Sequence, residues 1–398
     1  MDETERQRLE TERQGAAPPT ALVVYSGARF PGGAEAYLES LFLGYDRSRL
    51  RLLLVSMGEW DLTARLREMG EPVVVLEASR VAPRAPAAIA EVARSEGADL
   101  IASQGVVANF YARAAARVCG LPHMATVHSD LSFDYPGTAR RLAFSLVDRM
   151  LAGRTAHYLV PSEYLRRRLL SRGVPAERIS VVYHGIEPHS IVSTGTSRPG
   201  VASQRTSPDE DAAASERPPV LGSIGRLHHT KGFDLLIRAL PLISHPPSVE
   251  LIIWGEGEER ASLEKLIEEL GLGDRVRLPG YAPKVNRALA GMDIFVQPSR
   301  AEGFGLTVVE AMSAGLPVVV SQAGSLPELV ADGKSGVVVR GDRPADLARE
   351  LESLLAERGR RERLGAEAAR QARRRFTVER WLDQTTAVYE QAAGGTPR

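Results

Sequence analysis

Short apolar runs alternate with stretches of helical periodicity along most of this chain, and this alternation limits the fold more than any other feature. After the run "ALVVYS", for example, the segment "AEAYLESLFLGY" carries its apolar residues at helical spacing. Apolar strands separated by helices pair in parallel and are covered by helices on both faces. The expected strands lie at 21–26, 51–56, 72–77, 98–103, 123–129, 157–162, 179–185, 220–225, 250–255, 275–280, 294–299, 316–321 and 336–340.

The alternation is interrupted once, by a segment rich in Ser, Thr, Pro, Ala and charge at 190–219. Such a segment cannot bury enough apolar surface to order itself. With 398 residues, the chain is also too long for one ordinary core. We therefore expect two doubly wound, Rossmann-like α/β domains at 20–189 and 219–375, joined by a flexible linker or insertion at 190–218. Residues 1–19 are charged, lack the apolar core of a secretory signal and are expected to form a disordered leader.

Composition excludes several classes of protein. The formal net charge is zero, so overall charge gives no support for nucleic-acid binding. A single cysteine, Cys119, excludes an internal disulfide framework and fits a reducing compartment. No apolar run approaches the roughly 18 residues that a membrane span needs. These features predict a cytoplasmic protein with no nucleic-acid partner.

Two cations follow the first strand of the second domain. In open parallel sheets ligands bind beyond the carboxyl ends of the strands, so with two such domains we expect the site in the cleft between them. There "GSIGRLHHTKGF" places Gly225, Arg226 and Lys231 before Gly232, which opens a helix. Cations beside a helix N-terminus favour a diphosphate. The alternative is that both are ordinary loop cations.

The stretch "SRAEGFGLTVVEAMSAGLP" at 299–317 follows a later strand of the same domain. Its glycines let the backbone approach a ligand closely, and the helix that follows offers free amides to anionic oxygens. A carboxylate one turn into that helix can accept hydrogen bonds from two vicinal ribose hydroxyls. A solvent-facing glutamate is the alternative for that residue. The candidate site residues here are Glu302, Gly303, Phe304, Gly305, Leu306, Thr307 and Glu310.

The first domain adds glycines and one histidine to the same expected cleft. Gly32 and Gly33 precede a helix, but the glycine spacing is not that of the dinucleotide-binding fingerprint, which weakens an oxidoreductase interpretation. His128 lies at a strand end, where it is either a structural residue or a donor to a sugar hydroxyl or pyrophosphate. The eight histidines are scattered, and no metal-ligand spacing is present.

Three arginine-rich stretches have simple expected roles. The runs at 166–168 and 370–376 are expected to be solvated helix faces. A helix at 139–154 mixes apolar and basic residues and is expected to pack in a core. The alternative is that this helix lies on an anionic membrane surface, which would make the protein peripheral to the inner face of the membrane.

The motifs taken together resemble those of the family-4 retaining glycosyltransferases of the GT-B fold. "GRLHHTKG", "GEGEER", "RLPGY", "PSRAEGFGLTVVEAMSAGLPVV" and "SLPELVADGKSGVVV" occur in that family's order and spacing, and the resemblance runs from about residue 20 to 392. The family's usual Asn-Gly-Ile-Asp at the end of the first domain is replaced here by "HGIE". The segment 376–392 resembles the family's last helix, which packs back onto the first domain.

The resemblance implies a role for each candidate residue. Arg226 and Lys231 would bind the donor diphosphate, Glu310 the ribose, and Glu302 would lie beside the transferred sugar. Gly303, Phe304 and Gly305 would contact sugar or phosphates through their amides. Gly33 would close the first-domain side, and His128 would touch the donor sugar or support the departing phosphate.

The expected reaction is transfer of a hexosyl unit from a UDP- or GDP-linked sugar, with retention, to a glycan, lipid-linked or small-molecule acceptor. No metal or other cofactor is expected, because fixed cations balance the diphosphate charge. Two alternatives remain open: a sugar-nucleotide epimerase or hydrolase on the same fold, and a non-catalytic protein that binds sugar nucleotides or glycans.

Overall fold

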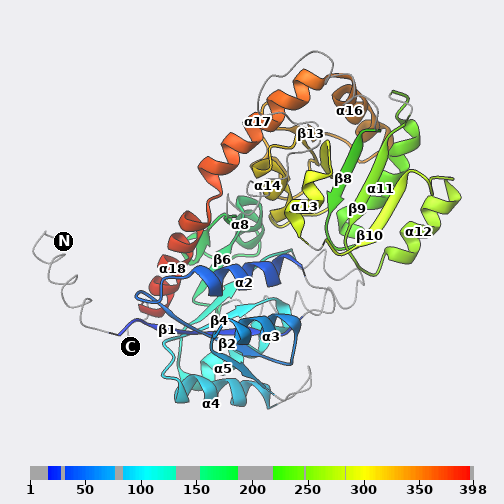
Figure 1. Ribbon diagram of the computed structural model, residues 1–398. Helices are drawn as coiled ribbons and strands as arrows, with labels where there is room; N and C mark the ends of the chain where they lie inside the picture. The colour runs from blue at the N-terminus through cyan, green and yellow to red at the C-terminus, as the bar shows by residue number, and fades with distance from the viewer. Residues whose placement is uncertain are drawn as a thin grey trace, which may run out of the picture.

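A computed structural model describes residues 17–27, 32–76, 84–130, 153–186, 218–245, 248–282 and 284–394. The chain forms two lobes, each built on a parallel sheet with helices on both faces (Figure 1). The predicted fold class is therefore confirmed. Nearly all of the predicted leader, of the linker at 190–218 and of the helix expected at 139–154 lies outside the described residues.

The N-terminal domain contains a seven-stranded sheet in the order β3-β2-β1-β4-β5-β6-β7. Its strands coincide with the apolar runs of the sequence, and most are fully buried, as strands covered on both faces must be. The strands are β1 (Thr20–Tyr25), β2 (Arg51–Ser56), β3 (Val73–Val75), β4 (Leu100–Gln104), β5 (His123–Thr126), β6 (His157–Val160) and β7 (Ile179–Val181).

Helices cover the two faces of this sheet in separate groups. Helices α2 (Gly33–Gly44) and α3 (Asp61–Glu68) pack on one face. Helices α4 (Ala85–Ser95) and α5 (Val106–Cys119) pack on the other face, where α8 (Glu163–Leu170) covers β6 and β7. A short 3₁₀ turn, η1 (Ala176–Arg178), leads into β7.

The C-terminal domain repeats this design with a six-stranded sheet in the order β10-β9-β8-β11-β12-β13. All its described strand pairs are parallel. The strands are β8 (Val220–Ile224), β9 (Glu250–Trp254), β10 (Val276–Gly280), β11 (Ile294–Gln297), β12 (Val318–Ser321) and β13 (Val337–Val339).

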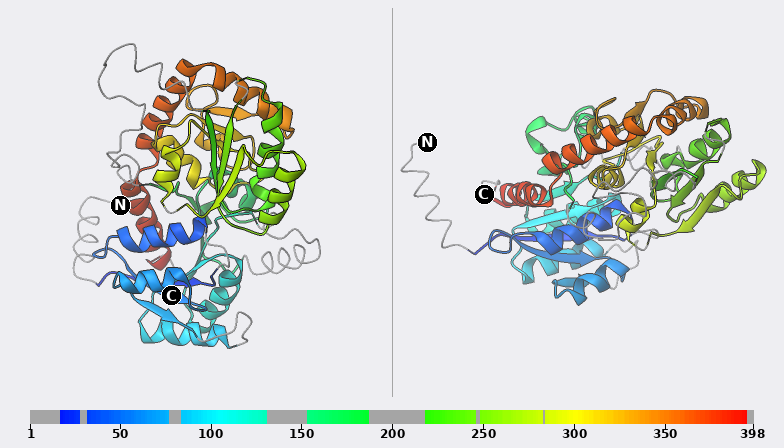
Figure 2. Two further views of the ribbon diagram at one scale, coloured as in Figure 1. Left: turned by 45° about the vertical axis from the view of Figure 1, so that its right-hand side comes forward. Right: turned by 45° about the horizontal axis from the view of Figure 1, so that its top comes forward.

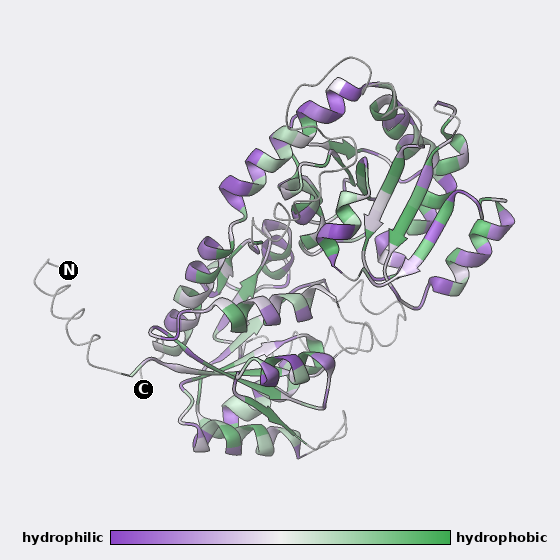
Figure 3. Cartoon of the chain, in the orientation of Figure 1, coloured by the Kyte–Doolittle hydropathy of each residue, from purple (hydrophilic) through white to green (hydrophobic). Residues whose placement is uncertain are grey.

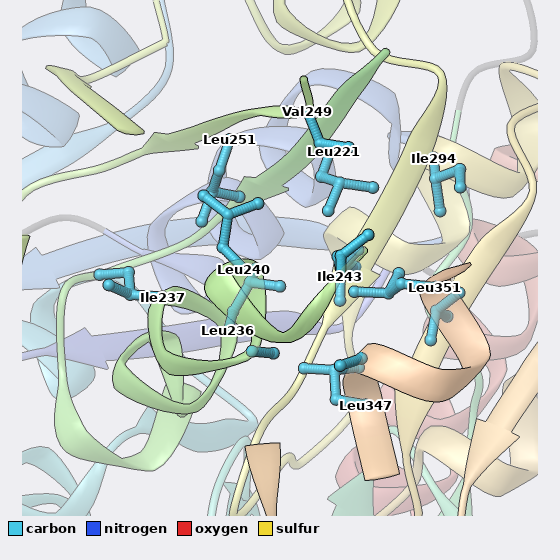
Figure 4. Packing of buried hydrophobic residues seen from close by; sticks show 14 of the residues in the cluster. Leu221, Leu236, Ile237, Leu240, Ile243, Val249, Leu251, Ile294, Leu347 and Leu351 are labelled. Atoms are coloured by element: carbon cyan, nitrogen blue, oxygen red, sulfur yellow. The ribbon is translucent and has the colours of Figure 1, made fainter. Parts of the chain in front are cut away.

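Leucine, isoleucine and valine side chains fill the space between this sheet and its outer helices (Figure 4). That face carries α11 (Phe233–Ala239), α12 (Arg260–Glu269) and α16 (Pro344–Ala356). The opposite face carries α13 (Val285–Ala290), α14 (Leu306–Ser313), α15 (Leu326–Leu329) and α17 (Arg358–Arg375). Two 3₁₀ turns, η2 (His229–Lys231) and η3 (Leu240–Leu242), flank α11.

The last two helices link the lobes. α17 belongs to the C-terminal domain, and α18 (Val378–Gly394) lies along the N-terminal domain, as both views of Figure 2 show. Trp381, Val388 and Tyr389 of α18 join the core around β1, β2 and α2. A bridge between Ile186 and Thr377 holds the two crossing segments together. The exposed side of α17 is strongly hydrophilic (Figure 3), as expected for the arginine-rich face. No helix in the described ranges is both long and apolar enough to span a membrane.

Candidate functional site

The two sheets place the predicted loops at their topological switch points. In the N-terminal domain, β1 lies between β2 and β4, and the crossover connections leave it in opposite directions. In the C-terminal domain, β8 lies between β9 and β11 in the same way. A crevice opens at the carboxyl ends of such strands. The loops after β8 and β11 carry Arg226, Lys231 and Glu302, so these three residues meet at one end of the sheet.

Lys231 and Glu302 form an ion pair at this point. Lys231 Nζ lies 2.7 Å from Glu302 Oε2, and the two side chains are only 22 % and 11 % exposed. Ser299 Oγ also donates to Glu302 Oε2 over 3.3 Å. Gly324 lies behind this loop, where an added Cβ would stand 2.0 Å from the Glu302 carbonyl oxygen. Backbone packing and two hydrogen bonds therefore hold the Glu302 carboxylate in place.

Arg226 is paired with a glutamate that the sequence reasoning did not select. Its guanidinium donates to both carboxylate oxygens of Glu258, with Nε 3.2 Å from Oε2 and Nη2 2.7 Å from Oε1. His228 Nε2 lies 3.7 Å from the same carboxylate. Burial, reinforced by His229, lowers the pKa of His228 to about 4, so this imidazole is neutral at physiological pH. The carboxylate of Glu258 thus occupies the Arg226 surface that a phosphate would need.

The N-terminus of α14 lies beside Glu302. Gly305 is its N-cap with φ of 96°, a left-handed conformation that favours glycine. Leu306 and Thr307 form the first turn, where backbone amides have no intrahelical acceptor. Val309 and Met312 are buried, whereas Leu306 is only half-buried. Amides at a helix N-terminus can bind an anion, and these lie next to the Lys231–Glu302 pair.

Glu310 stands one turn further along α14. Part of the residue is exposed, and its carboxylate accepts no hydrogen bond within the described part of the chain. The surrounding protein nevertheless removes enough hydration to raise the pKa of this carboxyl to about 8. Hydroxyl donors from a ligand would stabilise the ionised form of such a poorly hydrated carboxyl group.

His128 supplies the N-terminal side of the site. The carbonyl of His128 approaches Gly303 so closely that an added Cβ there would lie 1.9 Å from the oxygen. Its imidazole Nε2 lies 2.5 Å from Oε1 of Gln104, at the end of β4. Burial lowers the pKa of His128 to about 4, so the ring is neutral. The predicted histidine and the predicted glycine therefore meet across the domain boundary.

Gly32 and Gly33 lie at the start of α2, on the same domain as His128. The amide of Gly32 already donates to Glu35 Oε2 over 2.7 Å, and Tyr25 donates to Glu35 Oε1 over 2.6 Å. Glu35 therefore caps this helix from within, which leaves fewer amides for a ligand than the glycines alone suggested. Tyr37, one turn further along, contacts the His128 ring edge to face at 4.8 Å.

The two domains touch through several further contacts. Ser162 donates to the carbonyl of Gly303 over 2.7 Å. Glu328 of α15 accepts from the backbone amide of Glu163 over 2.9 Å, at the start of α8. The ring of Phe304 packs near Tyr183 in this junction, so only the backbone of Phe304 remains for a ligand. Within the described residues no group of three or more His, Cys, Asp or Glu is arranged to hold a metal ion.

Sequence reasoning missed Glu258, Gln104 and Glu328. Glu258 lies in the "WGEGEER" motif, directly after β9, and its position beyond a strand end was a usable signal. Gln104 also ends a strand at the switch point, so the same rule applied to it. Glu328 acts through a contact 165 residues away in sequence, which no local pattern indicates.

Two facing parallel-sheet domains with anion-binding loops at their switch points define the GT-B class of glycosyltransferases. Known proteins agree. The model of "Glycosyl transferases group 1" matches residues 205–371, and that of "Glycosyltransferase Family 4" matches residues 31–190. The chain belongs to glycosyltransferase family 4.

Named relatives in this family act on different substrates. A D-inositol 3-phosphate glycosyltransferase of Thermomonospora curvata is 38% identical over 194 residues, which is 44% of this chain and 45% of the relative. A GDP-mannose-dependent α-(1-6)-phosphatidylinositol monomannoside mannosyltransferase of Mycolicibacterium smegmatis is 34% identical over 206 residues, 47% of this chain and 52% of the relative. The match spans about half the length of each relative.

The fold continues over almost the whole chain. The crystal structure of HepE from Anabaena in complex with UDP and glucose superposes with a TM-score of 0.78, at 24% sequence identity, and covers 94% of this chain and 100% of HepE. At that identity the likeness establishes the fold alone.

Proposed function

We propose that this protein transfers a hexosyl unit from a nucleoside-diphosphate sugar to an acceptor hydroxyl, with retention at the anomeric carbon. The observation that carries the proposal is the Lys231–Glu302 pair, 2.7 Å apart beside the free amides of α14. It lies one residue from the point where Gly303 meets the His128 carbonyl of the other domain. Diphosphate and sugar would therefore sit between the lobes.

The donor diphosphate would bind Arg226, Lys231 and the amides of Leu306 and Thr307. These groups supply positive charge before the reaction begins, where negative charge grows on the leaving phosphate. Glu310 would accept hydrogen bonds from the ribose hydroxyls. Because its pKa is raised to about 8, tight ribose binding is coupled to loss of its proton near neutral pH.

Glu302 would balance the positive charge that develops on the sugar ring. Its carboxylate keeps one strong partner, Lys231, and both side chains are largely shielded from water, so their charges are weakly screened. The acceptor hydroxyl would attack from the face that the diphosphate leaves, and its proton would pass to the departing phosphate. Closure of the domains would exclude water and suppress hydrolysis of the donor.

The acceptor would lie against the N-terminal domain, and both a lipid-linked sugar and a small polyol phosphate fit the family. One relative's name specifies D-inositol 3-phosphate and another a phosphatidylinositol monomannoside. For the donor base, one relative's name specifies GDP-mannose, and the HepE structure contains UDP. We propose a cytoplasmic enzyme, and fixed cations make a divalent metal unnecessary.

Ligand-induced stabilisation tests the donor site. A ligand that binds only the native state raises Tm. UDP, GDP and their glucose and mannose conjugates are compared on the wild type, Lys231→Ala and Glu310→Ala. We expect one nucleotide series to raise Tm, less in both variants and equally with EDTA present. No shift with any nucleotide on folded protein contradicts the donor site, and a shift without sugar transfer favours a non-catalytic binding protein.

Turnover in the absence of acceptor separates the remaining alternatives. A transferase with a water-excluding cleft should release nucleoside diphosphate slowly until an acceptor hydroxyl is added. Rapid release without acceptor indicates a hydrolase, and a changed sugar on an intact nucleotide indicates an epimerase.

A further inference from the structure

Gln104 connects His128 to the centre of the N-terminal sheet. It is the last residue of β4, only 2 % exposed, and pairs in register with Thr126 of the neighbouring β5. Thr126 ends β5, and His128 follows it two residues later. The amide Oε1 of Gln104 lies 2.5 Å from His128 Nε2, and its Nε2 lies 3.1 Å from Thr126 Oγ1.

This geometry determines which imidazole nitrogen carries the proton. An amide oxygen only accepts hydrogen bonds, so His128 Nε2 must donate. The neutral ring has a single N–H, which leaves Nδ1 with a bare lone pair. Nδ1 has no partner within the described chain and is not among its buried, unpaired polar atoms. Nδ1 therefore keeps some exposure, on a residue that is half-buried.

The surrounding side chains hold this arrangement in place. Tyr37 of α2 contacts the imidazole edge to face with ring centroids 4.8 Å apart. Tyr389 of α18 lies against Thr126 and Gln104. His184 is a second histidine near His128, and burial lowers its pKa to about 3. Burial also raises the pKa of Tyr37, so both neighbours are uncharged near neutral pH.

We propose that Gln104 is a positioning residue that fixes His128 in the Nε2–H tautomer and presents Nδ1 to the cleft as a hydrogen-bond acceptor. If the proposed function holds, Nδ1 then accepts from a hydroxyl of the bound sugar. A lone pair cannot donate to a phosphate oxygen, so this tautomer replaces the donor role expected from the sequence with acceptance from a sugar hydroxyl.

The tautomer is measured directly in the ligand-free protein. Nitrogen-15 spectra of labelled histidine distinguish a protonated ring nitrogen from a bare one, and His128→Asn assigns the signal among the eight histidines. We expect Nε2–H in the wild type. Gln104→Leu should give a mixture of tautomers, and the nearly isosteric Gln104→Glu should give an imidazolium at neutral pH, because a carboxylate raises the pKa of the ring.

The binding consequence is measured with a nucleotide and its sugar conjugate. Gln104→Glu turns Nδ1 into a donor. Affinity for the nucleoside-diphosphate sugar that raises Tm in the stabilisation test should therefore fall about 3- to 10-fold, the scale of one hydrogen bond. Affinity for the nucleoside diphosphate alone should not change. Asn109→Asp is the control, since Asn109 accepts from Ser103 and not from His128.

The two measurements fail in different ways. An Nδ1–H tautomer in the wild type, or a single unchanged tautomer in Gln104→Leu, overturns the role of Gln104 whether or not any nucleotide binds. Equal weakening of the nucleotide and its sugar conjugate overturns the placement of Nδ1 against sugar. If no nucleotide binds at all, the donor site fails while the tautomer is still decided by the spectra.

Discussion

Each cation proposed to bind the donor diphosphate is paired with a carboxylate. Arg226 is bound by Glu258, and Lys231 by Glu302. The two pairs differ in exposure. Arg226 and Glu258 are each 42 % exposed, whereas the Lys231–Glu302 pair is largely shielded. A bound diphosphate would therefore replace Glu258 more readily than Glu302, so the proposed site would be preorganised at Lys231 but not at Arg226.

Replacing Glu258 should strengthen binding of the nucleoside diphosphate. In Glu258→Gln, Arg226 no longer loses a full ion pair when phosphate arrives. Because exposed pairs are weak, we expect only about a two- to fivefold lower Kd, measured by calorimetry at low salt. The gain should shrink as salt rises, since screening weakens the pair in the wild type.

Glu259→Gln is the matched control, because it removes the same charge one residue away. If both variants tighten binding equally, the effect is general electrostatics and not release of Arg226. Weaker binding in Glu258→Gln would mean that Glu258 orients Arg226 for the ligand.

Glu310 should make stability depend on pH. Its pKa is about 8 in the folded protein and about 4.5 in the unfolded chain, so between these values the folded state holds a proton that the unfolded chain has lost. The contribution of Glu310 to stability is therefore fully present below about pH 4.5 and is lost as the pH rises through about 8. In Glu310→Gln this loss of stability should be absent, because glutamine does not ionise.

The measurement is the urea midpoint of wild type and Glu310→Gln at about pH 5 and about pH 8. We expect the variant to gain stability relative to the wild type at the higher pH. A gap that stays constant between the two pH values would show that the Glu310 carboxyl titrates normally.

For single residues, the sequence predicted their places in the fold better than their ion-pair partners. Glu302, Lys231 and Arg226 were placed correctly at strand ends, because apolar runs locate strands and parallel strands share a direction. Whether they act as a site stays a prediction. The Arg226–Glu258 pair could not be predicted, because it joins residues 32 apart whose loops meet only after the sheet forms.

At the scale of elements, the loop from β11 to α14 is held between the two domains. Gly303 touches the His128 carbonyl, and Ser162 donates to the Gly303 carbonyl. This loop therefore links the orientation of α14 to the position of His128. The sequence predicted the strand, turn and helix here, since the glycines, apolar residues and Pro317 mark their limits. It gave no signal for the contact across the domain boundary.

Gly303→Ala should disturb this contact. An added Cβ would stand 1.9 Å from the His128 carbonyl oxygen, so the two domains must shift apart. We expect binding of the nucleoside-diphosphate sugar to fall at least tenfold, with a smaller loss for the nucleoside diphosphate alone, because only the sugar would span both domains. Calorimetry with both ligands measures this difference.

Gly291→Ala is the control. The nearest atom to a Cβ at Gly291 is 3.6 Å away, and its φ is −85°, so alanine fits without strain. Normal affinity for the sugar nucleotide in Gly303→Ala would show that binding does not require the close contact between the two domains at Gly303.

At the scale of the whole molecule, the last described helix returns to the N-terminal domain. α18 follows the C-terminal domain but packs into the N-terminal core, where Trp381 is 1 % exposed. The Trp381 ring stacks on His184 at 4.2 Å and meets Tyr37 at 5.1 Å. Tyr37 in turn contacts His128. α18 thus connects the segment that crosses between the domains to Tyr37, whose ring packs against His128. Only the assembled fold creates this arrangement.

Trp381→Ala should therefore weaken one lobe selectively. Truncating a fully buried tryptophan costs about 3–5 kcal/mol of unfolding free energy. The lost contacts belong to the core of β1, β2 and α2, so amide hydrogen exchange should rise in that core while β8–β13 keep their protection. Arg380→Ala, on the exposed side of the same helix, should leave exchange unchanged. Equal loss of protection in both lobes would mean that the domains unfold as one unit and that α18 does not stabilise the first domain separately.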